Sequence, residues 1–458
     1  MRRTAFLALA SLAACSMEPP LPPSPLPVPP SWPVGDPYLL QSEVLLPAFT
    51  YHDIFRDQRL QSLIIAALAN NRDLRVAAAN IAAARSQVRI TRANRLPQLD
   101  AAGRATVTGD ADNISLGLSI PSFEIDLFGR LRSLTRADQQ RLFATEAGAR
   151  AVRLALVGDI ADAWLAYAAD STLLDIAADT AGSAQKSVTL TKARLDGGIA
   201  PKTDLLQAQQ VLETAKLDLA RQRSARAQDV NLLQLLVGAP IDPPNLTASI
   251  EEAAATIALL PTGLDSRVLL RRPDVVQAEF ELRAANAEIG AARAALFPTI
   301  SLTGLLGLAS STLTGLFSGG AFAWSAGANA NYPIFRAGAG KARVAQTEAQ
   351  RNAALASYEK AIQTAFRDVA DALADRGTMA EQLRASGANV AAAAETLRLV
   401  NARYRGGIDP YLTTLDAQRS LYAAQRGRVT VALADANNSV ALYRALGADS
   451  FIAQGPFP

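Results

Sequence analysis

Apolar residues recur every seven positions through two spans that contain no proline, Asp53 to Leu96 and Lys202 to Val237. The repeating positions are Leu60, Ala67, Leu74, Ile81 and Val88 in the first span and Leu205, Leu212 and Leu219 in the second. A seven-residue repeat keeps one stripe of a helix facing a neighbouring helix. The pattern predicts helices that pack against partners along their length, and by itself it fits a soluble coiled-coil scaffold equally well.

Two longer stretches without proline lie between Pro121 and Pro201 and between Pro333 and Pro410. Both are rich in Ala, Leu, Arg, Gln and Glu, which favour helices. A continuous helix from residue 130 to residue 195 would extend roughly 100 Å at ~1.5 Å per residue. We expect two rods of this kind, with internal glycines such as Gly158 bending them rather than ending them.

The chain contains an internal duplication. At a shift of 209 positions, Ala193-Arg194 coincides with Ala402-Arg403, and the Gly-Gly-Ile-x-Pro segment at 197–201 coincides with the one at 406–410. Earlier in each half, Pro97 matches Pro298 at a shift of 201. The difference of eight predicts an insertion in the second half, within the Gly-, Ser- and Thr-rich residues around 309–321. One structural unit is therefore written twice.

The repeated Gly-Gly-Ile-x-Pro segment separates two helical spans in each half. Glycine tolerates the left-handed conformation after a helix end, and proline suits the first turn of the next helix. The motif predicts two helical hairpin tips. Their residues are Gly197, Gly198 and Pro201 in the first half and Gly406, Gly407 and Pro410 in the second.

Four segments between the helices alternate apolar residues with small or polar residues, at 99–108, 114–120, 300–308 and 322–332. Each has about the ~9 to 11 residues that a tilted membrane strand requires. Four strands cannot close a barrel, and lipid does not tolerate open sheet edges, so we expect three copies to supply 3 × 4 = 12 strands. A soluble four-stranded sheet packed on helices is the alternative. After Pro121 the apolar phase shifts, which predicts a bulge or bend.

Composition excludes several function classes. The 45 Lys and Arg residues nearly balance the 42 Asp and Glu residues, so we expect no nucleic-acid binding. One cysteine and one histidine, His52, exclude a cysteine-based metal cluster and a multi-histidine metal site. No phosphate-cradling loop is present. We therefore expect neither an enzyme nor a cofactor or metal site.

The N-terminus reads as a signal peptide, residues 1–14, with two arginines before a short apolar run. Leu12-Ala13-Ala14-Cys15 resembles the bacterial lipobox, which implies that Cys15 is lipidated and, because Ser16 is not aspartate, that the protein goes to the outer membrane. An ordinary secretory signal is the alternative. Residues 15–50 are then a lipidated tether, and its ten prolines from Pro19 to Pro37 favour extended geometry.

Several ordered motifs carry a family resemblance. They are Phe123-Glu124-Ile125-Asp126-Leu127-Phe128-Gly129-Arg130, Leu270-Arg271-Arg272-Pro273-Asp274, the run from Ile289 to Pro298, Pro333-Ile334-Phe335, and Leu415-Asp416-Ala417-Gln418-Arg419. With the lipobox, they resemble the TolC/OprM family of trimeric outer-membrane efflux channels, in its NodT-like lipoprotein branch. The resemblance covers Cys15 to about Gly447.

The resemblance implies a mainly α fold with a small β part. Three copies would form a 12-stranded β-barrel, four strands per protomer, continuous with a long periplasmic α-helical barrel. The implied function is passive export of small molecules in a tripartite efflux system. The implied partners are two further copies, a periplasmic adaptor, an inner-membrane pump of the resistance-nodulation-division type and outer-membrane lipid. Most of the mass would lie in the periplasm.

The second helical tip is followed by a candidate gate. Leu412, Asp416 and Arg419 are spaced four and three, so they share one helix face. In a trimer, a ring of Asp416 side chains would attract cations and Leu412 would add an apolar constriction. The resemblance further implies that Tyr404 and Arg419 tie neighbouring coils shut. A surface ion pair between Asp416 and Arg419 is the plain alternative.

We expect the domains to be a signal peptide at 1–14, a tether at 15–50, one efflux repeat at 51–240, a linker at 241–262, a second repeat at 263–447 and a tail at 448–458. Two other functions remain open from the sequence. The chain could form the outer-membrane outlet of a protein secretion system, or it could be a lipid-anchored coiled-coil scaffold without a pore.

Overall fold

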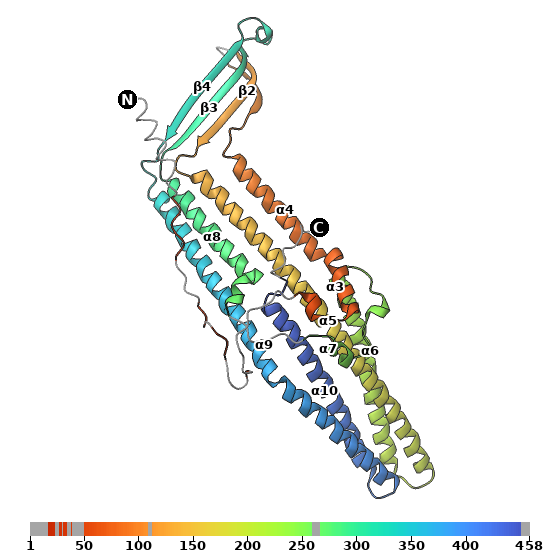
Figure 1. Cartoon of the computed structure of the whole chain (residues 1–458). Coiled ribbons are helices and arrows are strands. Elements are labelled where there is room, and N and C mark those ends of the chain that lie inside the picture. The colour runs from red at the N-terminus through yellow and green to blue at the C-terminus, as the bar shows by residue number, and fades with distance from the viewer. Residues whose placement is uncertain are drawn as a thin grey trace. The chain divides into compact units, whose positions relative to one another are not determined.

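A computed structural model describes residues 17–22, 27–29, 31–33, 38, 50–108, 112–258 and 266–449 (Figure 1). Cys15, the predicted signal peptide, most of the predicted tether and the residues after 449 lie outside this range. The chain forms two compact units. The sheet unit comprises residues 1–27, 77–149 and 274–361, and the hairpin unit comprises residues 28–76, 150–273 and 362–458.

The sheet unit contains four antiparallel strands in the order β1-β2-β3-β4, of which β2, β3 and β4 are labelled in Figure 1. They are β1 (Asp100–Val107), β2 (Asp112–Ile125), β3 (Thr299–Ser310) and β4 (Phe322–Asn331). All four predicted strands are confirmed. The register of β2 against β3 shifts between Ile120 and Phe123, which confirms the predicted bulge after Pro121.

Large apolar side chains of this sheet are exposed in the single chain. Leu116 and Leu118 of β2, Leu306 of β3 and Trp324 of β4 are among them, and Trp324 is 70% exposed. The connection between β3 and β4 is the longer one, as the insertion predicts, and contains the 3-10 turn η3 (Gly315–Phe317). A contiguous apolar surface on a folded chain indicates a lipid or protein contact.

Helices α5 (Arg130–Asp196) and α9 (Ala339–Arg405) contain 67 residues each and confirm the two predicted rods. Both begin in the sheet unit and continue into the hairpin unit. The Asp126 carboxylate accepts hydrogen bonds from the backbone N–H groups of Leu131 (3.1 Å) and Arg132 (2.8 Å), which satisfies free donors in the first turn of α5. The Arg130 guanidinium donates two hydrogen bonds to the Glu124 carboxylate, at 2.6 and 2.9 Å. This bidentate ion pair connects the end of β2 to the start of α5.

The first predicted heptad span is not one helix. The structure divides it into α2 (Tyr51–Ile54), α3 (Gln58–Asn70) and α4 (Arg72–Ala93). Asn71 causes the second break, because its side-chain oxygen accepts hydrogen bonds from the backbone N–H groups of Asp73 (2.8 Å) and Leu74 (3.1 Å). The heptad stripe itself is confirmed as buried at Leu60, Ala67, Leu74, Ile81 and Val88.

The remaining helices are α6 (Lys202–Val237), α7 (Ile250–Ala255), α8 (Pro273–Ala294) and α10 (Tyr411–Ala445), with 3-10 turns η1 (Pro243–Asn245) and η2 (Ser266–Arg271). In the hairpin unit α5 pairs with α6 and α9 pairs with α10 (Figure 1). The order helix, β-hairpin, long helix, shorter helix occurs in both halves of the chain, which agrees with the duplication. None of the described helices carries an apolar stretch long enough to cross a bilayer.

Candidate functional site

The two helical tips have nearly the same backbone. Gly198 and Gly407 both have φ of +73°, a left-handed conformation that glycine adopts without strain. In each tip the following isoleucine N–H donates to a carbonyl of the last helical turn, at 2.8 Å for Ile199 and 3.0 Å for Ile408. Each proline precedes the first helical residue as the N-cap, one position earlier than the sequence pattern suggests.

A charged pair distinguishes the second tip from the first. Arg403 donates two hydrogen bonds to the Asp409 carboxylate, at 2.7 and 2.9 Å, and these bonds hold the pKa of Asp409 below its usual range. The position that corresponds to Asp409 in the first half is Ala200, which has no charge. Only the second of the two tips therefore carries this ion pair across its turn.

Tyr404 is buried just behind the second tip. It packs with Ala208, Tyr411 and Leu415, and its exposed fraction is 7%. The Arg194 guanidinium lies over the Tyr404 ring at 4.7 Å from the centroid, a cation–π contact between α5 and α9. Residues of α5, α6, α9 and α10 therefore meet at this cluster, so that it joins the two helical hairpins of one chain.

The other three candidate gate residues lie on the surface of the single chain. Leu412 is 50% exposed. Asp416 and Arg419 are also exposed and approach each other at 3.8 Å, one turn apart on α10. The first-half positions Thr203 and Gln210 are likewise exposed, whereas Gln207 is half-buried. The structure places Leu412, Asp416 and Arg419 on one helix surface, and Tyr404 belongs to the buried cluster.

Arg419 also lines a groove of about 520 Å³ between the two hairpins, along with residues of α5, α6 and α9. The groove contains further cationic side chains, Lys186 and Arg405, and two carboxylates, Asp179 and Asp218. Tyr422 spans it by donating a hydrogen bond to Asp218 at 3.3 Å. The hairpins thus meet through a polar groove above a small apolar cluster.

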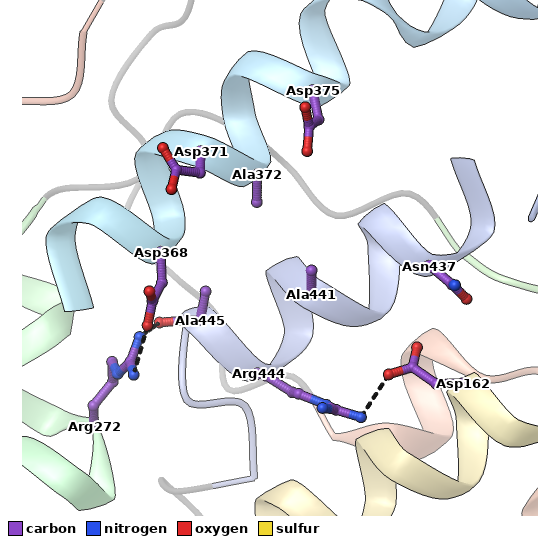
Figure 2. A pocket seen from close by; sticks show the side chains of 10 residues that line it. All are labelled: Asp162, Arg272, Asp368, Asp371, Ala372, Asp375, Asn437, Ala441, Arg444 and Ala445. Carbon is purple, nitrogen blue, oxygen red and sulfur yellow. Dashed lines mark hydrogen bonds and ion pairs between the residues drawn. The ribbon is translucent and has the colours of Figure 1, made fainter. Parts of the chain in front are cut away.

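A second charged cluster lies at the other end of α10, around a cavity of about 480 Å³ (Figure 2). Arg272, only 8% exposed, donates to the carbonyl of Ala445 at 3.1 Å and pairs with Asp368 at 3.3 Å. Arg444 pairs with Asp162 at 2.7 Å and with Asp159 at 2.9 Å. Two arginines therefore connect α10 to α9 and to α5.

Gly158 allows the Arg444 side chain to lie across α5. A Cβ atom at position 158 would stand 2.6 Å from Arg444 Cζ and 2.8 Å from its Cδ, closer than any normal contact. Burial raises the pKa of Asp162 to about 6, although the Arg444 charge opposes this shift. The contact between α5 and α10 therefore depends on a glycine and on a half-buried carboxylate.

Two carboxyl groups face each other between α5 and α6. Burial and the neighbouring charge of Asp170 raise the pKa of Asp229 to about 7, and burial raises the pKa of Asp170 as well. The pair therefore binds a proton more readily than two separate aspartates would. Among the described residues, no group of three or more His, Cys, Asp and Glu side chains is placed to hold a metal ion.

Sequence reasoning missed the roles of Arg194, Arg444 and Asp162. Arg272 was visible in the Leu-Arg-Arg-Pro-Asp motif, but only as part of a helix start, and α8 does begin at Pro273. One feature of the sequence could have drawn attention to Arg194: it coincides with Arg403 under the 209-residue shift. Arg444 and Asp162 gave none, since their pairing joins distant parts of the chain.

Comparison with known proteins identifies the family. The model of the outer membrane efflux protein family matches residues 63–239 and 264–448. The chain is 40% identical to the solvent efflux pump outer membrane protein SrpC of Pseudomonas putida, over 98% of each chain. It is 37% identical to the outer membrane protein OprJ of Pseudomonas aeruginosa, over 98% of this chain and 96% of that protein.

Solved structures agree with these sequence matches. The chain resembles a CusC crystal structure with a TM-score of 0.84 and 36% identity, covering 95% of this chain and all of that one. It resembles the open MtrE outer membrane channel of Neisseria gonorrhoeae with a TM-score of 0.83 and 34% identity, over 95% and 98% of the two chains. The expected TolC-like fold, outer-membrane location and efflux function are confirmed, and the chain belongs to the outer membrane efflux protein family.

Proposed function

We propose that three copies of this chain form a closed conduit that exports small molecules across the outer membrane as the outlet of a tripartite pump. The observation that carries the proposal is the four-stranded sheet. Within the described residues, β1 and β4 each pair with only one strand, so each has a free edge, and the sheet exposes large apolar side chains. Lipid does not tolerate such edges, and pairing β4 of one copy with β1 of the next removes them.

The names of the relatives support small molecules as cargo. Proteins 37% to 40% identical to this chain are named for solvent, toluene and antibiotic efflux or as OprJ. We propose an inner-membrane pump of the resistance-nodulation-division type and a periplasmic adaptor as partners. The tips offer the adaptor an apolar contact, because Ile199 is 71% exposed and Ile408 is 66% exposed.

Planar-bilayer recording and chemical cross-linking of the purified protein test the conduit. We expect discrete conductance steps and a cross-linked species of three chains. A stable single-copy species that conducts no ions would contradict the proposal. Drug susceptibility of a deletion strain, compared with the protein content of its culture supernatant, distinguishes small-molecule export from protein secretion.

We propose that Leu412, Asp416, Arg419 and Tyr404 form the gate at the periplasmic mouth. The 3.8 Å separation of Asp416 from Arg419, with both side chains more than half exposed, leaves the carboxylate available to passing cations. The Arg194–Tyr404 contact and the apolar cluster beside it would hold the two hairpins together when the gate is closed.

Asp416→Asn tests the gate. We expect altered single-channel conductance or cation selectivity with unchanged stability, because an exposed pair contributes at most ~1 kcal/mol. Glu213→Gln is the matched control, since Glu213 forms a similar exposed pair with Lys216 on α6. Traces of Asp416→Asn that equal those of wild type would leave Asp416 and Arg419 as an ordinary surface pair.

We also propose that Cys15 carries the lipid. Metabolic labelling with radioactive palmitate should mark the wild-type protein and not Cys15→Ser. Equal incorporation in both proteins, or none in wild type, would refute the lipidation.

A further inference from the structure

The first described residues of the chain are held by the sheet unit. The Glu18 carboxylate accepts hydrogen bonds from Arg136 at 2.6 Å and from Asn286 at 3.4 Å. The same Asn286 amide donates to the carbonyl of Pro19 at 2.8 Å. Arg136 lies in the second turn of α5, and Asn286 lies on α8 with an exposed fraction of 2%. A charged side chain and a backbone carbonyl of the N-terminal segment are therefore both recognised by these helices.

Gly290 provides the space for this contact. A Cβ atom at position 290 would lie 3.1 Å from the backbone nitrogen of Glu18, 3.2 Å from its Cα and 2.9 Å from the hydroxyl of Ser133. Ser133 is itself buried on α5. A larger residue at position 290 would have to displace either the N-terminal segment or the α5–α8 packing. Glycine is thus required by the close approach of the segment's backbone.

We infer that Glu18, Pro19, Arg136, Asn286 and Gly290 form a clamp that fixes the position of the lipid anchor on the protein. The inference rests on the proposed lipidation of Cys15. Glu18 is three positions after Cys15, and three residues of fully extended chain span at most roughly 11 Å. Gly290 is about one turn from the end of α8 at Ala294.

The position of the clamp suits a membrane anchor. Strand β3 begins at Thr299, a few residues after α8, and β2 ends at Ile125 shortly before α5. The clamp therefore lies beside the end of the sheet where strands and helices meet. Farther along the segment, Trp32 stacks on Phe366 at 5.0 Å in the hairpin unit. Trp32 is seventeen positions after Cys15, so a segment held only at Trp32 would let the anchor range over up to roughly 60 Å.

A spin label on the segment tests the clamp in the full-length protein in detergent. Leu21→Cys places the label on a described, exposed residue three positions after Glu18, while an acylated Cys15 cannot react. We expect an immobilised spectrum in the otherwise unchanged protein. Glu18→Ala and Gly290→Val should each raise the ratio of mobile to immobile label roughly tenfold, as expected for losing hydrogen bonds to a charged group.

Glu288→Ala is the matched control. It removes the ion pair between Glu288 and Arg141 on the same two helices and leaves the clamp residues in place. A mobile label in the protein with an intact clamp would overturn the inference, as would a control that mobilises the label as much as Gly290→Val. Mass spectrometry of the N-terminal peptide reports acylation separately. Absence of the lipid would refute the lipidation of Cys15, and the label mobility, then measured with Cys15→Ser in the same protein so that only Leu21→Cys reacts, would still decide whether the clamp exists.

Discussion

Replacing Gly158 with alanine should destabilise the protein when Arg444 is present and stabilise it when Arg444 is replaced by alanine. Gly158 lies in the interior of α5, where a change from glycine to alanine ordinarily stabilises a helix by about 1 kcal/mol. Here the added Cβ would occupy the space of the Arg444 side chain. The substitution therefore gains helix propensity and loses the two ion pairs of Arg444. The larger of these two effects decides whether the free energy of unfolding rises or falls.

The magnitude follows from the exposure of the pair. Arg444 is 32% exposed, and its partners Asp159 and Asp162 are 48% and 38% exposed. Exposed ion pairs contribute ~0.2–1 kcal/mol each, and hydrogen bonds to charged groups reach ~1.5–3 kcal/mol when protected from water. We take about 1–3 kcal/mol for the whole contact. Gly158→Ala should then destabilise the wild-type protein by about 0–2 kcal/mol and stabilise the Arg444→Ala protein by about 1 kcal/mol.

Thermal unfolding followed by circular dichroism, on all four proteins of the cycle in the same detergent, measures this coupling. Gly182→Ala is the control, since position 182 lies on the same helix with nothing near an added Cβ. It should stabilise both backgrounds equally. An equal effect of Gly158→Ala in the presence and absence of Arg444 would refute the contact between α5 and α10 as described.

Substitutions at three further positions test other parts of the fold. Asp229→Asn should raise the unfolding temperature at pH 8 and change it little near pH 4. The raised pKa of Asp229, about 7, means that the folded chain binds the proton more tightly than the unfolded chain does. The stabilisation that this proton gives is therefore present below the ordinary pKa of about 4 and is lost as the pH rises through about 7. An equal effect at both pH values would contradict the carboxyl pair with Asp170. Gly407→Ala should destabilise the second tip by about 1 kcal/mol in urea unfolding, because alanine is strained at φ of +73°, and a neutral result would argue against the left-handed turn. Asp126→Ala should cost about 1 kcal/mol by removing the hydrogen bonds to the first turn of α5, and Asp126→Asn, which keeps an acceptor, should lose less in the same assay.

The sequence predicted the elements of this fold better than their contacts. Proline and glycine act on their immediate neighbours, so the span 130–195 located α5 within one residue of its observed end at Asp196. The break at Asn71 was missed because the heptad stripe continues through it at Ala67 and Leu74, although the Asn71 side chain makes the break with its own neighbours Asp73 and Leu74. The Asn71 amide also donates to the carbonyl of Leu236, at 2.8 Å, near the end of α6.

The candidate site shows the same division. The tip glycines were predictable because a repeated motif requires a particular backbone. The Arg272 and Arg444 contacts join residues that are far apart in sequence, and no local pattern distinguishes an arginine that pairs across helices from one that is solvated. The gate remains a prediction, since a ring of Asp416 carboxylates exists only where several copies meet.

The duplication gives each experiment on the second hairpin a natural reference within the same polypeptide. The two turns share their glycine geometry, yet Ala200 stands where the later copy has Asp409, and Gln207 stands where it has Asp416. Transplanting these residues from one copy to the other would separate what the turn needs in order to fold from what ancestral divergence added to it. The two halves of the chain thus share one structural framework, and the second half carries additional charged residues that the framework itself does not require.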